Sequence, residues 1–355
     1  MNRKALFLAL TLGALACHKN NNGGNQVPNA GNFVQTNLVS DTTSYGAAIV
    51  DPTLKNAWGL ALNPGADIIW VSANHSGATN LYDLTGRTVL GPIPIPSMGV
   101  QNGGSPTGVA FNPTNDFIIP NIGGTAKFVF ANEDGTISAW PQVAAVTTTV
   151  VDKSSFKAVY KGCTFATQGG NTYLYATNFG EHSIDIFDKN WHDVEGFAFR
   201  DPAIPAGFSP FNIANIGGLL YITYAKRTAD NQDDDPAPGN GYVDIYTTDG
   251  TLVKSFASQG PLNSPWGIAQ APQGSGLPLH SILVGNFGDG MINVYDSTGA
   301  YQGVLQNGGK PIVIEGLWAL DFLANEDPKL DPTQLYFTAG PKDEQHGLLG
   351  YLKKQ

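Results

Sequence analysis

Charged residues are scarce in this chain of 355 residues, at 14 % of the composition, whereas a typical globular protein has roughly 25 %. Hydrophobic residues make up 42 %. Together these values exclude intrinsic disorder and coiled coils, which need more charge or less apolar content. Positive charge is the scarcer sign, and the net charge of −10 argues against a nucleic-acid partner, whose backbone would repel the chain.

Long hydrophobic runs are also missing. The apolar run over residues 5–16 is twelve residues long, too short to span a bilayer. It follows Arg3 and Lys4 and ends just before Cys17, with small residues at the cleavage positions, which is typical of a signal peptide. A cysteine in this place resembles a bacterial lipobox. We therefore predict a signal peptide over residues 1–16 and lipidation of Cys17, with ordinary secretion as the alternative.

Cysteine occurs only twice, as Cys17 and Cys163, so lipidation of the first would leave no partner for a disulfide. Residues 17–32 are rich in Asn and Gly and predict a flexible tether. We expect an exported protein that touches the membrane only through its lipid. It would be either a lipoprotein of the bacterial cell envelope, periplasmic or at the surface, or a secreted protein.

Nucleophile and phosphate motifs are absent. The chain has no Gly-x-Ser-x-Gly, no His-Glu-x-x-His and no Gly-x-x-x-x-Gly-Lys sequence. Cys163 lies in a predicted inner strand, where a buried hydrophobic role is expected. These absences leave the reaction, if there is one, without a local signature.

A repeated unit is the strongest positive signal. The segment Trp58-Gly59-Leu60-Ala61 recurs as Thr107-Gly108-Val109-Ala110 and as Trp266-Gly267-Ile268-Ala269. Looser copies start near residues 162, 211 and 318, so the spacing is about 50 residues. A second element, Asn-turn-strand, follows each start, as in residues 178–188 and 286–296.

Four short strands per repeat predict an all-β, six-bladed β-propeller over residues 33–355, with four antiparallel strands in each blade. The last repeat lacks residues for its outer strand, so we expect residues 33–39 to close the ring there. A β-sandwich or two separate domains are the alternatives.

Two family resemblances follow from these residues. The element that ends in Ile292-Asn293-Val294-Tyr295-Asp296 resembles NHL-type and gluconolactonase-like six-bladed propellers. An uncharacterised bacterial propeller family, some of whose members carry a PEP-CTERM sorting signal, resembles the chain over nearly its whole mature length. The segments that carry this second resemblance are residues 37–41, 56–60, 70–74, 105–108, 176–180 and 285–290. Both resemblances imply the propeller fold, and the bacterial family has no established activity to carry over.

In a propeller, the loops before the innermost strands and the loops after the second strands open on one face, which we call the loop face. The channel mouth on that face is the default binding site. Its expected ligand-binding residues are His75, Lys161, Asn178, His182, Asn212, Lys226, Asn286, Asp289, Glu315 and His346. The same loops carry Asn56, Glu133, Asp134, Glu181, Arg227, Asp343 and Glu344.

Several of these residues have a structural interpretation beside the functional one. His75, His182 and His346 lie on equivalent loops and could share a metal, but no local His-x-x-x-His spacing supports it, so separate solvated residues are favoured. Recurrent asparagines favour turn capping. Recurrent tryptophans at the strand starts favour packing between blades over carbohydrate stacking. These residues are Asn74, Asn132, Asn178 and Asn286, and Trp58, Trp266 and Trp318.

Two sets could hold Ca²⁺. The gluconolactonase-like resemblance implies a metal held by carboxylate and Asn side chains, for which Glu315, Asn178 and Asn212 are the candidates, with Glu315 catalytic. The insertion Asp230-Asn231-Gln232-Asp233-Asp234-Asp235 has carboxylates at alternate positions, but it lacks the glycine and distal glutamate of an EF-hand loop. For the insertion we expect a solvated acidic loop.

Three functional hypotheses remain. The first is a monomeric propeller that binds a small molecule, a glycan or an envelope protein on its loop face. The second is a Ca²⁺-dependent lactonase or lyase of the gluconolactonase-like type. The third is a structural envelope protein, which predicts a plugged channel.

Overall fold

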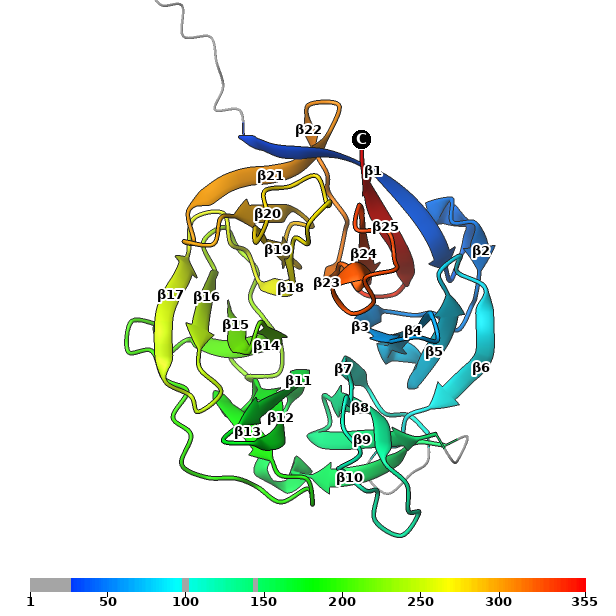
Figure 1. The fold of residues 1–355 in the computed structure, drawn as a ribbon, viewed down its shortest axis with the longest axis vertical. Helices are drawn as coiled ribbons and strands as arrows, with labels where there is room; N and C mark the ends of the chain where they lie inside the picture. Colours follow the sequence, from blue (N-terminus) through cyan, green and yellow to red (C-terminus); the bar gives the residue numbers. More distant parts are fainter. Residues whose placement is uncertain (1–26, 98–101, 143–145) are drawn as a thin grey trace, which may run out of the picture.

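The structure is a computed structural model that describes residues 27–97, 102–142 and 146–355. Its strands form sheets arranged around a central axis (Figure 1), which confirms the all-β prediction. Helix is limited, in these residues, to the short 3-10 turns η1 (Thr43–Tyr45), η2 (Asn74–Ser76), η3 (Ser154–Phe156) and η4 (Leu323–Asn325). A membrane-crossing helix is not found among the described residues. The predicted signal peptide and Cys17 lie outside them.

Four sheets stand alone, and each runs from an inner to an outer strand. The first sheet holds β3 (Ala57–Asn63), β4 (Ile68–Ala73), β5 (Ala78–Asp83) and β6 (Thr88–Pro94). The second holds β7 (Pro106–Phe111), β8 (Ala126–Asn132), β9 (Thr136–Pro141) and β10 (Thr148–Asp152). The third holds β11 (Tyr160–Gln168), β12 (Asn171–Asn178) and β13 (Ser183–Phe187). The fourth holds β14 (Phe208–Ile216), β15 (Leu219–Lys226), β16 (Gly241–Tyr246) and β17 (Leu252–Ser258).

The remaining strands form one ten-stranded sheet made of two runs. The β18 run contains β18 (Pro265–Gln270), β19 (Ile282–Asn286), β20 (Ile292–Tyr295) and β21 (Tyr301–Asn307). The β23 run contains β23 (Leu317–Asp321), β24 (Gln334–Ala339), β25 (Leu348–Lys354) and β1 (Asn29–Ser40). The short strands β2 (Ile49–Val50) and β22 (Lys310–Pro311) pair with β1 and β21.

Strand β1 joins the two ends of the chain. From Phe33 to Ser40 it pairs antiparallel with β25, as predicted for the closing strand. It begins at Asn29, inside the segment expected to be tether, and residues 29–32 pair in parallel with β21. The polar tether composition does not prevent this pairing, because an outer strand needs main-chain hydrogen bonds more than buried side chains.

The third sheet departs from the predicted four strands. After β13, the described chain makes only one isolated bridge, between Phe187 and Asp193, and no fourth strand. Residues 188–207 instead cover neighbouring side chains with aromatic rings, such as Phe197 against Tyr173 and Phe199 against Tyr175. Pro202 and Pro205 cannot donate main-chain hydrogen bonds, which disfavours a ladder there.

Repeat glycines let the inner strands approach one another. A Cβ on Gly59 would lie 2.4 Å from Thr107 O, and a Cβ on Gly108 would lie 2.8 Å from Cys163 N. Each of these atoms belongs to the inner strand of the next sheet, Thr107 to β7 and Cys163 to β11. The repeat therefore carries glycine because any side chain would push adjacent inner strands apart.

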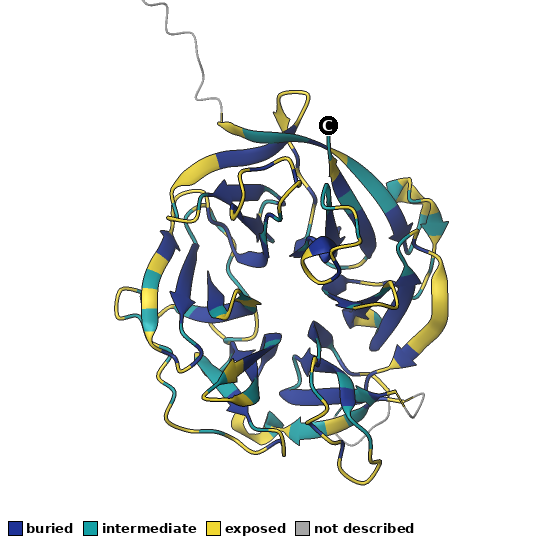
Figure 2. Cartoon of the chain, in the orientation of Figure 1, coloured by how far each residue is buried: buried dark blue, intermediate teal, exposed yellow. Residues whose placement is uncertain are grey.

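Burial falls from the inside of the ring to the outside (Figure 2). Strand β3 is mostly buried, whereas β6 is mostly exposed. Between sheets the cores are aromatic and aliphatic. Trp70 of the first sheet, for example, stacks on Phe128 of the second with centroids 4.1 Å apart.

Candidate functional site

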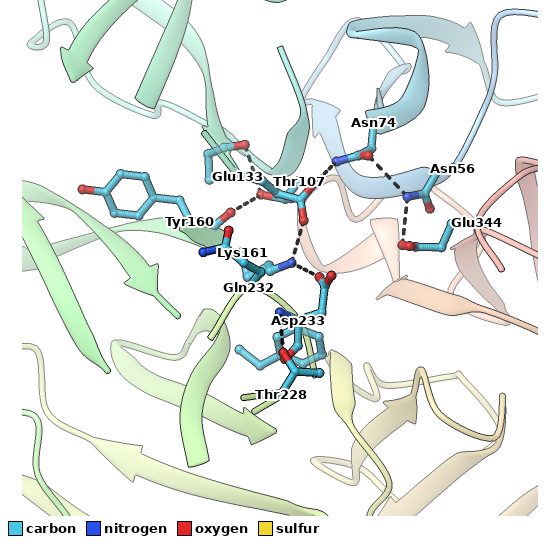
Figure 3. Close-up of polar contacts among 12 residues, drawn as sticks. Asn56, Asn74, Thr107, Glu133, Tyr160, Lys161, Thr228, Gln232, Asp233 and Glu344 are labelled. Atoms are coloured by element: carbon cyan, nitrogen blue, oxygen red, sulfur yellow. Dashed lines mark hydrogen bonds and ion pairs between the residues drawn. The ribbon is translucent and has the colours of Figure 1, made fainter. Parts of the chain in front are cut away.

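A polar network on the loop face joins residues from separate sheets (Figure 3). Asn56 donates to Glu344 over 2.9 Å and to Asn74 over 3.4 Å. Asn74 donates in turn to Glu133 over 2.9 Å, and the ammonium of Lys161 lies 2.6 Å from Glu133. These residues come from loops that the repeat had placed on one face.

Lys161 is the buried centre of this network. Only 1 % of its side chain is exposed, and it pairs with Asp233 at 2.9 Å as well as with Glu133. Burial lowers its pKa, but the two carboxylates outweigh burial and raise the pKa above its ordinary value. Its ammonium also lies 5.1 Å from the ring centroid of Trp58.

Glu344 is the carboxyl group that burial perturbs most in this network. Burial raises its pKa to about 7, and the nearby charge of Glu133 adds to the rise, while the hydrogen bond from Asn56 opposes it. A pKa of about 7 means that the Glu344 carboxyl changes its protonation state near neutral pH, in the network that contains the Lys161 ammonium.

An aromatic plug lies beneath the network. Trp58 and Trp318 stack with centroids 3.7 Å apart, and Phe287 stacks on the other side of Trp318 at 4.0 Å. Trp266 meets both tryptophans edge-on and donates from Nε1 to the Lys161 carbonyl over 3.1 Å. The packing prediction for these tryptophans is confirmed, since each is at most 4 % exposed.

The acidic insertion is largely solvated, as expected, with Asp230, Gln232 and Asp233 exposed, but it also folds back onto two lysines. Asp233 reaches Lys161, and Asp235 pairs with Lys226 at 2.6 Å. Burial raises the pKa of the intervening Asp234 to about 6. The insertion folds back because two lysines neutralise it, which sequence spacing could suggest for Lys226 but not for Lys161.

The three loop-face histidines do not converge on one point. The Nδ1 atom of His182 lies 2.7 Å from the Ser209 hydroxyl, and Nδ1 of His346 lies 2.9 Å from Asp41. His75 is exposed. Across the described ranges no three His, Cys, Asp or Glu residues form a group that could hold a metal.

The candidate Ca²⁺ ligands Asn178, Asn212 and Glu315 do not present free, converging oxygens. The side-chain oxygen of Asn178 accepts the main-chain N–H groups of Val159 and Glu181, each over 3.2 Å. The Asn212 oxygen accepts its neighbour's N–H over 2.8 Å, and Glu315 accepts the Lys342 N–H over 3.1 Å. The residues present therefore do not fit a Ca²⁺ ion held by this set.

The repeated asparagines behave as turn residues in three of four repeats. Asn132 donates to Thr136 and Ser138, and Asn178 bridges the turn that follows it. Asn286 donates to Asp289 over 3.1 Å. Asn74 is the exception, because its amide belongs to the polar network.

A cavity of about 640 Å³ occupies the channel at the end opposite the loop face. It is lined by the later residues of the inner strands and by the turns after them, including Pro64, Pro113, Ile216 and Gln270. Its wall also contains Cys163, whose pKa burial raises to about 12, so the thiol is protonated and inert as a nucleophile.

Two acidic residues line this cavity, Asp321 at the end of β23 and Glu326 just after η4. The two carboxyl groups interact electrostatically, and the charge of Asp321 raises the pKa of Glu326. The surrounding protein raises the pKa of both carboxyls, although cavity solvent reaches Glu326, which is exposed.

The repeat itself marks Asp321, a signal that our sequence analysis missed. In the inner strands of the first, second and β18 units, the matching position is Ala61, Ala110 or Ala269. The third and fourth inner strands have Thr164 and Ala214 there, so Asp321 is the charged residue at a position otherwise held by small side chains, and it departs from the packing rule. Such departures are expected at functional sites.

Sequence relatives decide the family. No family model matches the chain. It is 36 % identical over 335 residues to uncharacterized protein L690 of Acanthamoeba polyphaga mimivirus, which covers 90 % of this chain and 86 % of that protein. It is 34 % identical over 336 residues to uncharacterized protein R648 of the same virus, covering 89 % and 79 %. The chain belongs to the family of these mimivirus proteins. Because these relatives are viral, the resemblance of this chain to a bacterial propeller family stays a prediction.

Solved structures support the fold of this chain. A streptogramin B lyase matches with a TM-score of 0.52 and 13 % identity, covering 91 % of this chain and 97 % of the lyase. The U3-55K structure matches equally well, with a TM-score of 0.52, 12 % identity and coverage of 91 % and 99 %. Because this chain is equally similar to two such differently named proteins, the comparison supports the β-propeller architecture and does not indicate an activity.

Proposed function

We propose that this chain is a six-bladed β-propeller that binds a small molecule in the cavity of its central channel. The count takes the four separate sheets as four blades and the β18 and β23 runs as two more, joined because β1 pairs with both β21 and β25.

The cavity is the observation that carries this proposal. Its volume of about 640 Å³ lies in the usual range for small-ligand sites, roughly 300–1,000 Å³. Apolar side chains such as Leu60, Val109 and Ile268 line its wall, and one part of the wall carries the carboxyl groups of Asp321 and Glu326. An apolar wall with a few convergent polar groups is typical of a binding pocket.

The loop face supports a different role. The aromatic plug closes the channel there, and the Lys161 network ties neighbouring sheets together above it. The loop-face residues expected to bind a ligand, including Glu315, therefore stay a prediction, and the experiment below tests both ends.

Metal-dependent lactonase or lyase chemistry is a weaker candidate. Glu133 and Asp233 contact the same ammonium at 2.6 and 2.9 Å, so the chain supplies its own cation to these carboxylates. In the other candidate ligand set, side-chain oxygens of Asn178, Asn212 and Glu315 already accept hydrogen bonds from main-chain N–H groups. We route no reaction step through a metal.

Export and lipidation at Cys17 complete the proposal and depend only on residues 1–32. A Cys17→Ser variant of the full chain, expressed in a bacterial host, is expected to leave the membrane fraction and lose incorporation of labelled palmitate. Retention of the label would contradict lipidation at Cys17.

Ligand binding is tested by a thermal-shift screen of small polar and amphipathic molecules against the full chain. Gln270→Trp should fill the cavity mouth and abolish stabilisation by hits, whereas Val253→Trp, exposed on the outer strand β17, should preserve it. Glu344→Gln tests the loop face and should also preserve it. Hits that tolerate Gln270→Trp but fail with Glu344→Gln would move the site to the loop face.

A further inference from the structure

The cavity carries negative charge that the protein does not neutralise. Its lining residues include two carboxylic acids, Asp321 and Glu326, and no Lys, Arg or His. The basic side chains Lys161, Lys226 and Arg227 lie in the loop-face network or beside the acidic insertion. A ligand in the cavity therefore meets carboxyl groups without a competing cation.

No cation of the cavity wall stabilises the charged form of these two carboxyls. Burial raises the pKa of both, and the charge of Asp321 raises the pKa of Glu326 further, so ionising both would set two negative charges on one stretch of the wall. A positively charged group between the two carboxyls would remove this cost.

The wall around the pair suits an apolar chain. Leu60, Val109, Ile213, Ile268 and Leu320 all line the cavity. At the rim, Asn325 donates to the Gln270 carbonyl over 2.8 Å, which fixes the turn that carries Glu326. A ligand with one charged end and an apolar body would match both parts.

We infer that the cavity takes a small amphipathic organic cation, a protonated alkylamine, whose ammonium lies between the carboxyl groups of Asp321 and Glu326. This inference rests on the proposed binding function and names its ligand class. An ammonium is favoured over a divalent metal because the cavity offers two carboxyls, and the described chain has no group of three His, Cys, Asp or Glu residues. Carboxylate ligands are excluded by repulsion.

Binding exchanges one positive charge for another. The ligand enters as R–NH₃⁺ and remains protonated, while any proton that the carboxyl pair holds leaves for the buffer. Affinity should therefore rise with pH while the pair still holds its proton, and level off once that proton is lost.

The test is calorimetric titration of the full chain with n-hexylammonium, alongside neutral hexanol, hexanoate and CaCl₂ as matched probes. Hexylammonium should bind with release of a proton, detected by comparing buffers of different ionisation enthalpy. Its affinity should increase about tenfold or more between about pH 5 and about pH 8. Hexanoate should not bind.

Isosteric variants locate the site. Asp321→Asn and Glu326→Gln should each weaken hexylammonium binding by about tenfold or more, since each removes a charge from the contact. Both variants keep the shape of the side chain, and a thermal melt of each verifies the fold. Glu344→Gln, which alters a carboxyl at the other end of the channel, should leave binding unchanged.

The outcomes separate the two proposals. If hexanol binds as tightly as hexylammonium and both carboxyl variants bind normally, the cation inference is overturned while the cavity remains a binding site. Calcium binding that Glu326→Gln abolishes, without hexylammonium binding, would replace the amine with a metal. If no probe binds and no hit of the thermal screen depends on Gln270, both proposals fail.

Discussion

The ammonium of Lys161 lies 2.6 Å from the carboxylate of Glu133, a residue of the neighbouring sheet. The lysine side chain is 1 % exposed and the glutamate side chain 27 %, so solvent reaches this pair only from the side of Glu133. The contact links the third sheet to the second, and through Asp233 to the fourth. We therefore regard Lys161 as a structural tie on the loop face.

Replacing Lys161 by methionine should destabilise the fold by about 2–3 kcal/mol, because the carboxylates lose their partner while the alkyl chain stays packed. The value is below that of a fully buried pair, since Glu133 is 27 % and Asp233 is 69 % exposed. Urea unfolding measures it. Adding Glu133→Gln to Lys161→Met should recover part of the loss, and a double variant that is simply additive would contradict the pairing.

Glu344→Gln should stabilise the protein increasingly as the pH rises. The pKa of Glu344 in the folded protein, about 7, lies above its ordinary value of 4.5. Ionisation of Glu344 therefore lowers the free energy of unfolding of the wild type as the pH rises between these two values. Glutamine does not titrate. The gain should reach about 1–2 kcal/mol near pH 8, reduced by solvent access, and vanish near pH 4.5.

Melting temperatures of wild type and Glu344→Gln at the two pH values check this prediction. Asp343→Asn, on an exposed neighbour in the same loop, is the matched control and should show no such trend. A constant difference across the pH range would mean that Glu344 ionises normally in the folded protein.

Gly59→Ala should cost about 2–3 kcal/mol, because the added methyl group would lie 2.4 Å from the main-chain oxygen of Thr107. Gly91→Ala is the control, since nothing lies within 4 Å of its added Cβ. The control should be neutral or slightly stabilising, as the unfolded chain loses freedom. Chemical denaturation distinguishes them, and equal effects would refute the close-approach explanation of the repeat glycine.

Phe33→Ala should destabilise the protein by about 3–5 kcal/mol, whereas Val34→Ala should cost less than about 1 kcal/mol. The two residues are adjacent on β1, but Phe33 is fully buried and Val34 is 36 % exposed. Calorimetric melts of both variants test whether β1 is a packed strand of the ring. Similar, small losses would show that the strand is only loosely attached.

Local sequence patterns were sufficient to predict the β-sheet architecture. Alternation and turn residues predicted the strands of each unit, and the shortage of strand residues after the last repeat predicted that residues 33–39 would pair with it, as β1 does with β25. The missing fourth strand of the third sheet was not foreseen. The repeat period suggests a strand there, but it does not report that aromatic side chains such as Phe197 and Phe199 cover the edge instead.

The candidate site, too, was predictable from the sequence only in part. Repeat position placed Asn56, Glu133, Lys161 and Glu344 on one face, and these residues do form one network. It did not show that Asp233 would reach Lys161, because an insertion has no counterpart in the other repeats. The empty volume at the opposite end was equally invisible, since a cavity is a property of packing.

By itself, the sequence determined the strand-rich repeat, the glycines between inner strands and the closing role of the N-terminal strand. These follow from side-chain periodicity and backbone sterics, which act between near neighbours or recur in every unit. Only the tertiary structure decided that the channel is plugged at one end and open at the other, with Asp321 and Glu326 both on the wall of the opening. Those features depend on how separate sheets meet at the axis, and the free volume arises only when the ring has closed.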